Sequence, residues 1–496
     1  PVPGFQDLAG LAHEIEPGLW AELLFEGEAF ETEDQRNWID ASFKTYGTPL
    51  QLPRPVTVPA GARMRQAVTL RLRSDGTPVR FLQSAPPPPV LLHAAGTVQC
   101  RLPELGLGMA SHGQPLSERE LARLSGLGIS HLRADLRLAD RRWPETLRAA
   151  AREALELGAA LELAVHLPPD QPGDLAFVAK ELARLKADPI RALILREGQK
   201  STTAADLHAA RTALADCGLA IGAGTDADLY QLHLQPPAGG ADFLSWSMNP
   251  QVHARDLTSI AETPEAAAQQ VAAVREHFGN VPLAISPITL RPRFNPVADG
   301  PENATPPEEL PPRVDPRQMS LFGAAWTLAM LAALAPTGVE SLTLFETTGG
   351  CGVMETESGS FFPAQFPSLP GAVFPLYHVL ADVGEFAGGE VLGVNPAPAH
   401  ALAFMGLRKA DRTAFWLANL AEEPRRIHLS GLPGTVRWRR LDETSVLAAM
   451  TEPEMFRREA GPSAGSIQEE FTLPALAVLR LLISSGPPGR GASQLS

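Results

Sequence analysis

The pattern of hydrophobic and polar positions changes twice along the 496-residue chain. Near the start, residues 56–72 alternate apolar and polar positions around a turn, and residues 18–25 form a short apolar run. Both patterns favour β-strands. From about residue 103 onwards, short apolar runs alternate with helical periodicities, and after about residue 388 short strand patterns return. The pattern therefore predicts a β region, an alternating β/α region and a second β region.

Eight strand candidates lie in the middle region, at 105–110, 131–136, 161–167, 191–196, 220–224, 243–247, 282–286 and 341–345. Helical patterns separate most of them, and Ser117 with Glu120 predicts a capping box at the start of the first helix. Alternating strands and helices pair in parallel through right-handed crossovers. Eight units over roughly 280 residues predict a closed (β/α)8 TIM barrel. An open doubly wound sheet is the alternative, but the sequence lacks its Gly-rich phosphate loop.

The predicted fold class is α/β, with a TIM barrel flanked by an N-terminal β-rich region and a C-terminal β-sandwich. We place the N-terminal region at 1–89, ending in a polyproline linker, and the barrel at 90–387. The sandwich covers 388–485, and the Gly/Ser/Pro-rich stretch 486–496 is predicted to be a flexible tail. Within the barrel, helices are expected at 264–278 and 319–334, among others.

The composition of the chain argues against two classes of partner, nucleic acids and membranes. The net charge of −14 argues against nucleic acid, because phosphate binding needs a basic face. The apolar run 321–336 is too short to span a bilayer, so no membrane association is predicted. Three widely spaced cysteines, Cys100, Cys217 and Cys351, form neither a disulfide framework nor a zinc motif and favour a cytoplasmic protein. We expect no cofactor, and a homo-oligomer stays open.

In a barrel of this type, polar residues at the carboxyl ends of the strands build the active site. The predicted strand ends carry many carboxylate, imidazole, amide and guanidinium groups, which suit a polyhydroxylated substrate. The catalytic candidates are Glu197, Glu346, His253, Asn249 and Arg291. The candidates for substrate binding are Arg133, Asp135, His166, Asp226, Gln251 and Ser286.

Two other kinds of site are less favoured. His112, His166 and His253 lie at strand ends but lack the tight spacing of metal ligands, so no metal is predicted. Cys217 and Cys351 have no histidine partner evident in the sequence, which makes them poor candidates for a nucleophile.

A glycosidase is the competing enzyme class. Glu197 follows the fourth strand, where barrel glycosidases carry their acid/base, and a retaining enzyme needs a second carboxylate about 5 Å away. The seventh strand usually supplies that group, yet here it ends in Ser286, and Glu346 comes from the eighth. A retaining glycosidase using Glu197 and Glu346 remains the alternative. A non-catalytic carbohydrate-binding protein is less favoured, because the chain has only seven Trp and three Tyr.

Several long motifs point to a known family. They are residues 33–46 (EDQRNWIDASFKTY), 249–254 (NPQVHA), 285–295 (ISPITLRPRFN), 320–326 (SLFGAAW), 346–349 (ETTG) and 366–380 (FPSLPGAVFPLYHVL). Together they resemble the bacterial D-apionate lactonase family, over nearly the whole chain. The resemblance implies hydrolysis of D-apionolactone in D-apiose catabolism, with a small sugar lactone as partner. It also implies an N-terminal β region, a barrel and a C-terminal β region. We transfer no residue roles from it.

Lactone hydrolysis is acyl transfer to water, and it needs a base, donors for the oxyanion and an acid for the leaving oxygen. We assign Glu346 and Glu197 as base and acid, in an order that stays open. The candidate oxyanion donors are His253, Asn249 and Arg291, while Asp226 and Arg133 would hold hydroxyls.

One motif of the N-terminal region is unusually rich in charge. Asp34, Arg36, Asn37, Asp40 and Lys44 crowd a short stretch of an otherwise plain β region. We favour an ion-pair network that docks this region on the barrel over a contribution to the pocket rim, because ion pairs at domain contacts are common.

Overall fold

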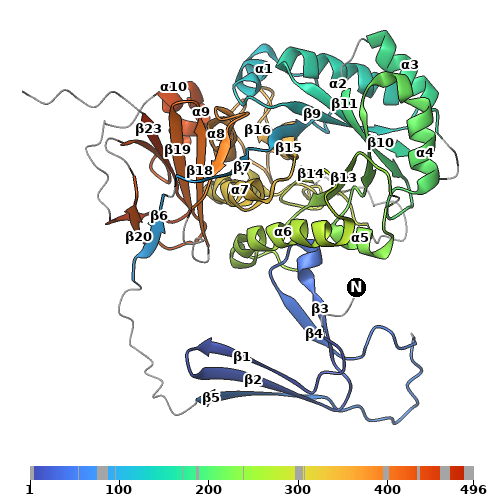
Figure 1. Cartoon of the computed structure of the whole chain (residues 1–496), viewed down its shortest axis with the longest axis vertical. Helices are drawn as coiled ribbons and strands as arrows, with labels where there is room; N and C mark the ends of the chain where they lie inside the picture. Colours follow the sequence, from blue (N-terminus) through green and yellow to red (C-terminus); the bar gives the residue numbers. More distant parts are fainter. Residues whose placement is uncertain are drawn as a thin grey trace, which may run out of the picture. The chain divides into compact units, whose positions relative to one another are not determined.

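The computed structural model (Figure 1) describes residues 5–53, 55–74, 88–94, 96–169, 171, 173–185, 189–237, 239–296, 305–306, 308–394, 401–432, 436–458 and 470–484. The predicted tail, 486–496, lies outside the described residues. The chain forms two compact units. The first comprises Pro1–Asn37 and Ala41–Pro88, and the second comprises Trp38–Asp40 and Pro89–Ser496.

The first unit is built from β-strands. β1 (Gly10–Glu16), β2 (Leu19–Glu26) and β5 (Ala67–Ser74) form an antiparallel sheet in the order β1-β2-β5. β3 (Glu31–Asp34) and β4 (Phe43–Tyr46) form a separate antiparallel pair. The apolar run 18–25 is thus a strand, as predicted, whereas the alternating stretch 56–72 becomes a strand only from Ala67 onwards.

The second unit contains the predicted barrel. Its strands are β8 (Glu104–Gly108), β9 (His131–Arg137), β10 (Ala160–Leu167), β11 (Pro189–Arg196), β12 (Ala220–Gly224), β13 (Phe243–Met248), β14 (Leu283–Ile288) and β15 (Ser341–Thr348). Neighbouring strands pair in parallel in that order, and β15 pairs with β8. This last pairing closes the sheet, which confirms the predicted (β/α)8 fold.

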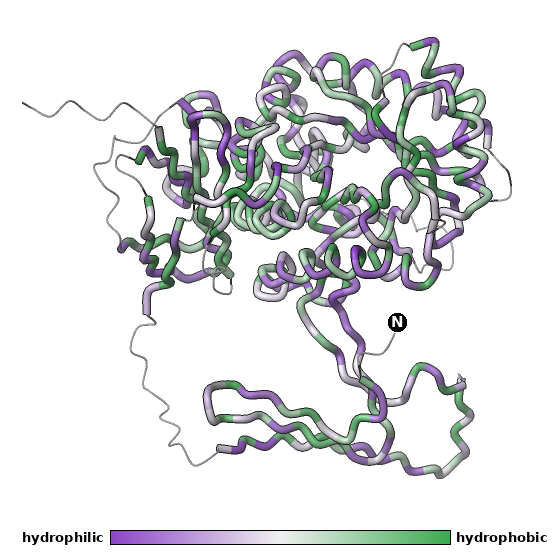
Figure 2. The backbone as a smooth tube through the Cα atoms, in the orientation of Figure 1, coloured by the Kyte–Doolittle hydropathy of each residue, from purple (hydrophilic) through white to green (hydrophobic). Residues whose placement is uncertain are grey.

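Helices cover the outside of the barrel (Figure 1). They are α1 (Glu118–Ser125), α2 (Trp143–Leu157), α3 (Leu175–Leu185), α4 (Ala204–Ala213), α5 (Leu229–Leu234), α6 (Leu257–Phe278), α7 (Leu321–Leu334) and α8 (Pro375–Gly384). Ser117 and Glu120 form the predicted capping box at α1. Figure 2 shows hydrophilic and hydrophobic positions alternating along several of these helices, as expected where one face packs on the barrel.

Helix α6 begins seven residues earlier than the predicted 264–278. Asp256 caps its start by accepting a hydrogen bond from the Ser259 N–H at 2.9 Å. Pro264 therefore lies inside the helix, where it cannot donate a backbone hydrogen bond. The Thr263 hydroxyl donates to the Ile260 carbonyl at 2.7 Å instead, so the carbonyl that Pro264 leaves free still has a partner.

The barrel interior contains a buried polar layer below its carboxyl-end mouth. Glu162 of β10 accepts a hydrogen bond from Arg191 Nε at 2.6 Å and another from the Ser286 hydroxyl. Burial alone would raise the pKa of Glu162, but neighbouring positive charges, including Arg191, lower it to about 2. His131 lies in the same layer, and its Nε2 is hydrogen-bonded to the Thr343 hydroxyl at 2.9 Å.

The C-terminal region consists of β17 (Glu390–Leu392), β18 (Leu402–Lys409), β19 (Arg412–Asn419), β20 (Arg425–Ser430), β21 (Val436–Leu441), β22 (Glu470–Leu473) and β23 (Val478–Ser484), with the short helices α9 (Val446–Thr451) and α10 (Pro453–Arg458). Two earlier strands complete its sheets. β6 (Val90–His93) pairs with β20, and β7 (Val98–Arg101) pairs with β17. The sheets therefore combine segments that precede and follow the barrel.

None of the helices in the described ranges combines the length and the apolar character that crossing a bilayer requires.

A buried acid on α2 gives a test of this architecture. Glu153 is 6 % exposed, and burial raises its pKa to about 7. The folded state therefore holds a proton that the unfolded state releases, so stability falls as the pH rises from about 4.3 through 7. We expect Glu153→Gln to stabilise the protein by up to about 3 kcal/mol at pH 8 and much less at pH 5.

Thermal unfolding at the two pH values measures this difference. Glu156→Gln, on the exposed side of the same helix, is the matched control and should change Tm little at either pH. Equal Tm values for the Glu153→Gln variant and the wild type at pH 8 would contradict the assigned pKa.

Candidate active site

A polar hollow lies at the carboxyl ends of the barrel strands, where active sites of this fold are found. Two adjoining cavities share Met109, Asp135, Arg293, Arg313 and Glu346 in their walls, and we call them together the mouth cavity. The larger of the two has a volume of about 610 Å³. The mouth cavity brings together Glu346 and Asp135, both predicted from the strand ends.

Glu346 comes from β15 and lines both parts of the mouth cavity. Its Oε2 accepts a hydrogen bond from the Ser111 backbone N–H at 2.8 Å. Desolvation raises the pKa of Glu346 above its usual value, although the Ser111 N–H and nearby cations act in the opposite direction. A raised pKa makes the Glu346 carboxylate a stronger base, as a group that takes a proton from water needs to be.

A buried guanidinium organises the floor of the mouth. Arg133 is 2 % exposed and donates to Asp135 Oδ1 at 2.9 Å and to Asp226 Oδ1 at 2.5 Å. Its other terminal nitrogen donates to the Ser286 carbonyl at 2.6 Å and to the Ser286 hydroxyl at 3.1 Å. Ser286 therefore holds the Arg133 guanidinium by two hydrogen bonds. The predicted substrate-binding residues Arg133, Asp226 and Ser286 form one hydrogen-bonded network.

Arg293, from the loop after β14, pairs with the same two carboxylates. It donates to Asp135 Oδ2 at 2.6 Å and to Asp226 Oδ1 at 2.7 Å. Burial alone would raise the pKa of Asp135, but Arg133 and Arg293 hold it well below its usual range. His166 Nε2 lies 3.1 Å from Asp135 Oδ1. Two carboxylates and two guanidiniums thus balance in charge at the centre of the mouth.

Asp135, His166 and Asp226 are also the described residues whose ligand atoms could converge on a metal ion, since these atoms lie within 4.8 Å of one another. The two aspartates, however, already accept hydrogen bonds from Arg133 and Arg293. A divalent cation at this point would have to displace a guanidinium or sit beside it. The donor set therefore fits an ion-pair cluster better than a metal centre.

Glu197 lies in a different hollow. A cavity of about 680 Å³ is lined by Glu197, His166, Asp226 and Lys200, among others, and we call it the Glu197 cavity. The Glu197 carboxylate lies 3.4 Å from an Arg137 guanidinium nitrogen. Glu197 does not line the mouth cavity, and Glu346 does not line the Glu197 cavity. The two predicted catalytic carboxylates thus line different cavities, although Arg137 and Phe294 belong to the walls of both the larger mouth cavity and the Glu197 cavity.

The remaining catalytic and binding candidates belong to the loops that follow β13 and β14. Arg291 lines the mouth cavity, and its Nε donates to Asp315 at 3.1 Å. Gln251 is buried and donates to the same Asp315 at 2.7 Å, so it positions Arg291 through a shared partner. Asn249 is also buried, and its side-chain oxygen accepts from the Gln251 N–H at 3.4 Å. Neither amide lines the mouth cavity.

His253 is paired away from the mouth cavity. Its Nδ1 lies 2.8 Å from Asp40 Oδ2, and its ring contacts Trp38 edge-on. Trp38 also packs on Tyr230 of α5, with ring centroids 4.4 Å apart. Trp38–Asp40 belong to the barrel unit, so these contacts lie within one compact body. His253 is thus an anchor for this segment in the structure, and it lines none of the cavities described above.

The structure adds residues that the sequence did not single out as candidates. Arg293 was visible in the Arg-Pro-Arg stretch after the seventh strand, but nothing marked it above Arg291. Arg313 follows two prolines in a long connection, and no sequence signal places it at the mouth cavity. Cys351 lines the same cavity, where burial and then the charge of Glu346 raise the pKa of its thiol. A protonated thiol is a poor nucleophile, as expected for Cys351.

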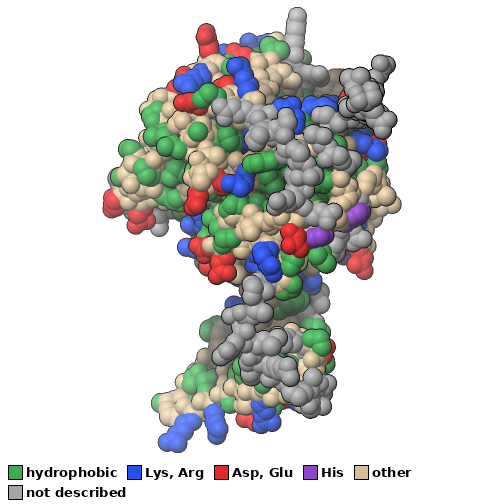
Figure 3. Space-filling view, turned by 90° about the vertical axis from the view of Figure 1, so that its left-hand side faces the viewer, with side chains coloured by type: hydrophobic (Ala, Val, Ile, Leu, Met, Phe, Trp, Pro, Cys, Tyr) green, Lys and Arg blue, Asp and Glu red, His purple; other side chains and the backbone are tan. Residues whose placement is uncertain are grey.

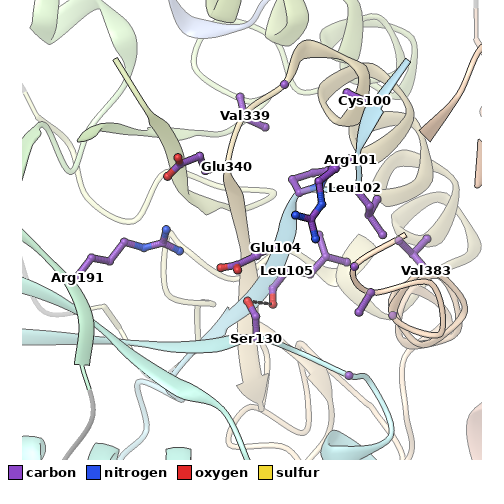
Figure 4. Close-up of a pocket in the computed structure, with 16 residues that line it drawn as sticks. Cys100, Arg101, Leu102, Glu104, Leu105, Ser130, Arg191, Val339, Glu340 and Val383 are labelled. Atoms are coloured by element: carbon purple, nitrogen blue, oxygen red, sulfur yellow. Dashed lines mark hydrogen bonds between the residues drawn. The ribbon is translucent and has the colours of Figure 1, made fainter. Parts of the chain in front are cut away.

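Another cavity, of about 700 Å³, lies at the opposite end of the barrel (Figure 4). Glu104 begins β8, Ser130 precedes β9 and Glu340 precedes β15, so its walls are the amino ends of strands. The Ser130 hydroxyl donates to the Leu105 carbonyl at 3.1 Å, the bond drawn in Figure 4. This end of such barrels contributes mainly to stability, so we place the chemistry at the other end.

The fold and the mouth cavity define a (β/α)8-barrel protein with a polar site suited to a hydroxylated substrate. Family models agree over almost the whole chain. They describe the D-apionate lactonase N-terminal domain at residues 1–75, TIM barrel domain at 105–388 and C-terminal immunoglobulin-like domain at 398–481. The chain belongs to the D-apionate lactonase family, and its membership makes it a hydrolase of a cyclic ester. The resemblance found in the sequence motifs is confirmed.

One curated relative and two solved structures are similar to this chain. A D-apionate lactonase of Brucella anthropi is 27 % identical over 446 residues, covering 87 % of this chain and 71 % of that protein. Among solved structures, CelM2, a bifunctional glucanase-xylanase from a metagenome library, matches with a TM-score of 0.52 and 10 % identity, covering 81 % of this chain and all of CelM2. A GH30 endoxylanase from Clostridium papyrosolvens matches at 0.50 and 13 %, covering 80 % of this chain and all of the endoxylanase. At such identities the likeness concerns the fold alone.

The ion-pair cluster leads to a test with chelators. Because Arg133 and Arg293 neutralise Asp135 and Asp226, we expect lactone hydrolysis to keep its full rate after dialysis against EDTA. The rate of acid release from a lactone, with and without added Mn²⁺ or Zn²⁺, measures this. A loss of activity that a divalent cation restores would contradict the ion-pair interpretation.

Proposed function

We propose that this protein hydrolyses D-apionolactone to D-apionate, with Glu346 as the residue that moves the proton. The single observation that carries the proposal is the position of Glu346, in a polar cavity at the barrel mouth with a raised pKa and with cationic side chains in the same walls. The family and the relative from Brucella anthropi, which is named a D-apionate lactonase, supply the substrate class.

The first step is attack of water on the lactone carbonyl. Glu346, in its ionised form, takes a proton from the water, and the oxygen of that water bonds to the carbonyl carbon. The carbonyl oxygen then carries a negative charge. Arg293 and Arg291 both line the cavity, and their fixed positive charges stabilise this oxyanion more strongly than they stabilise the neutral ester.

The second step opens the ring. The bond between the carbonyl carbon and the ring oxygen breaks, and the ring oxygen takes the proton that Glu346 received from water. The new acid group loses its proton to solvent and leaves as a carboxylate. One carboxyl group thus serves as base and then as acid. A separate acid is not required, which accounts for a site in which Glu197 lies in another cavity.

The charged groups of the mouth give this cavity a preference for hydroxylated substrates. Asp135 is half-buried and borders the mouth cavity, while Asp226 and His166 border the Glu197 cavity. Carboxylate oxygens still have free lone pairs after binding a guanidinium, so they accept hydrogen bonds from substrate hydroxyls. We assign Asp135 this role for the lactone bound beside Glu346.

The glycosidase alternative has weaker support. A retaining mechanism needs two carboxyl groups about 5 Å apart facing one bond. Glu197 and Glu346 line different cavities, and Ser286, which lies within β14, is hydrogen-bonded to Arg133. The carboxylate that shares the mouth cavity with Glu346 is Asp135, which is paired with Arg133 and Arg293. This pairing favours oxyanion stabilisation over a covalent glycosyl intermediate.

Substitution of Glu346 tests the assignment directly. We expect Glu346→Gln to lower kcat for D-apionolactone by about 100-fold or more, because the amide cannot take up the proton from water. Glutamine keeps an oxygen that can accept the Ser111 N–H, so the fold should be preserved. Glu197→Gln is the matched control and should stay within about twofold of wild type, whereas a glycosidase-type pair would make both variants equally inactive on aryl glycosides.

The pH dependence offers an independent check. If ionised Glu346 is the base, kcat/KM falls as the pH drops through its pKa, which lies above the ordinary glutamate value of about 4.3. We expect the midpoint of the acid limb above that value. Initial rates between pH 4 and 8 with a pH-stable lactone would show it. A rate that stays constant down to pH 4 would argue against Glu346 as the base.

A further inference from the structure

A second polar cavity lies in the C-terminal β-region, and it is lined mainly by arginines. The cavity, of about 220 Å³, has in its walls Arg412 of β19, Arg437, Trp438 and Arg439 of β21, Arg457 and Arg458 of α10, Arg480 and Leu482 of β23, and Glu385 after α8. Figure 3 views the molecule from the side of the C-terminal β region and shows both basic and acidic side chains on its surface. In a chain of net charge −14, six arginines around one small cavity need an explanation.

Part of this charge has a structural role. Asp382 of α8 accepts from Arg439, Arg457 and Arg480 at 2.6, 2.6 and 2.9 Å. These bonds join the last barrel helix to the C-terminal sheet, and burial of Asp382 makes its arginine partners necessary, since an unpaired buried carboxylate would be costly.

Glu385 accepts the rest of the paired charge. Arg412, Arg457 and Arg480 donate to its two oxygens at 2.6, 2.7 and 2.7 Å. Four arginines therefore share two carboxylates, which leaves an excess of positive charge even within the paired set.

Two further arginines increase the excess. Arg437 and Arg458 are exposed at the cavity wall, and within the described part of the chain neither makes an ion pair. In addition, Arg480 is only 8 % exposed, and its buried Nε has no hydrogen-bond partner among the described residues. An unsatisfied buried donor costs free energy unless something else accepts its hydrogen bond. Because that Nε is shielded from solvent, a ligand in the cavity would be held by the surplus of cations around it.

We propose that this arginine cavity binds a phosphate-bearing small anion with two or more negative charges. The planar guanidinium presents paired N–H donors that match the oxygens of a phosphate, and several such groups around one hollow favour a multiply charged ligand over a monoanion. The ligand would bind between α10, β21 and β23, outside the mouth cavity.

The test is titration calorimetry of the full-length protein with sodium pyrophosphate in low salt, with citrate and D-gluconate as comparison anions. We expect saturable pyrophosphate binding and at least about tenfold weaker binding of D-gluconate, since each charge-assisted hydrogen bond lost has an effect of that order. The double variant Arg437→Gln/Arg458→Gln should bind pyrophosphate at least about tenfold more weakly than wild type. These two residues are chosen because they hold no described ion pair, so the fold should persist.

The control is Arg152→Gln, which removes an exposed arginine on α2 of the barrel and should leave pyrophosphate affinity within about twofold. Lactone hydrolysis is measured in parallel, and it should be equal in wild type and both variants, so failure of this site is distinguishable from failure of the proposed activity. The proposal is overturned if pyrophosphate does not bind, if citrate binds more tightly, or if the double variant binds pyrophosphate as wild type does.

Discussion

The barrel mouth depends on one physical constraint, the burial of the Arg133 guanidinium. A permanently charged group inside a closed barrel is costly unless hydrogen-bond acceptors of opposite charge surround it. Ser286 accepts from one of its nitrogens, and Asp135 and Asp226 accept from the other. These acceptors come from β9, β14 and the end of β12, so one buried cation fixes the relative positions of three strand ends.

The two carboxylates that neutralise Arg133 in turn need a second cation. Asp135 and Asp226 together carry one negative charge more than Arg133 neutralises, and Arg293 supplies the balancing cation. Because Arg293 belongs to the loop after β14, the ion pairs hold that loop over the mouth. Arg293 lines the mouth cavity beside Glu346, while Asp226 borders the Glu197 cavity. The same network that stabilises a buried charge therefore contributes to the walls of both cavities and places the Arg293 guanidinium in the cavity of Glu346.

The sequence predicts the framework better than the site. Periodicity finds all eight barrel strands and the polar positions that follow them, because alternation and strand length are local properties. It does not show how far a side chain reaches or which partner it meets. The sequence predicts Ser286 at a strand end and His253 after one. Ser286, however, lies within β14 and accepts from Arg133, and His253 pairs with Asp40, which is more than two hundred residues away. β6 and β7 likewise join sheets whose other strands follow the barrel, a pairing that no local pattern contains.

The end of β14 shows how one barrel mouth can favour a particular reaction. A carboxylate there, facing a second acid, suits attack at a sugar carbon with positive charge developing on the ring. Here β14 ends at Ile288 without a carboxylate, Ser286 within it is hydrogen-bonded to Arg133, and the loop beyond it contributes Arg291 and Arg293 to the cavity wall. Cations oppose a positively charged transition state and stabilise the negative one of ester hydrolysis. In the proposed mechanism, two guanidiniums where a glycosidase would carry a carboxylate therefore favour lactone over glycoside cleavage.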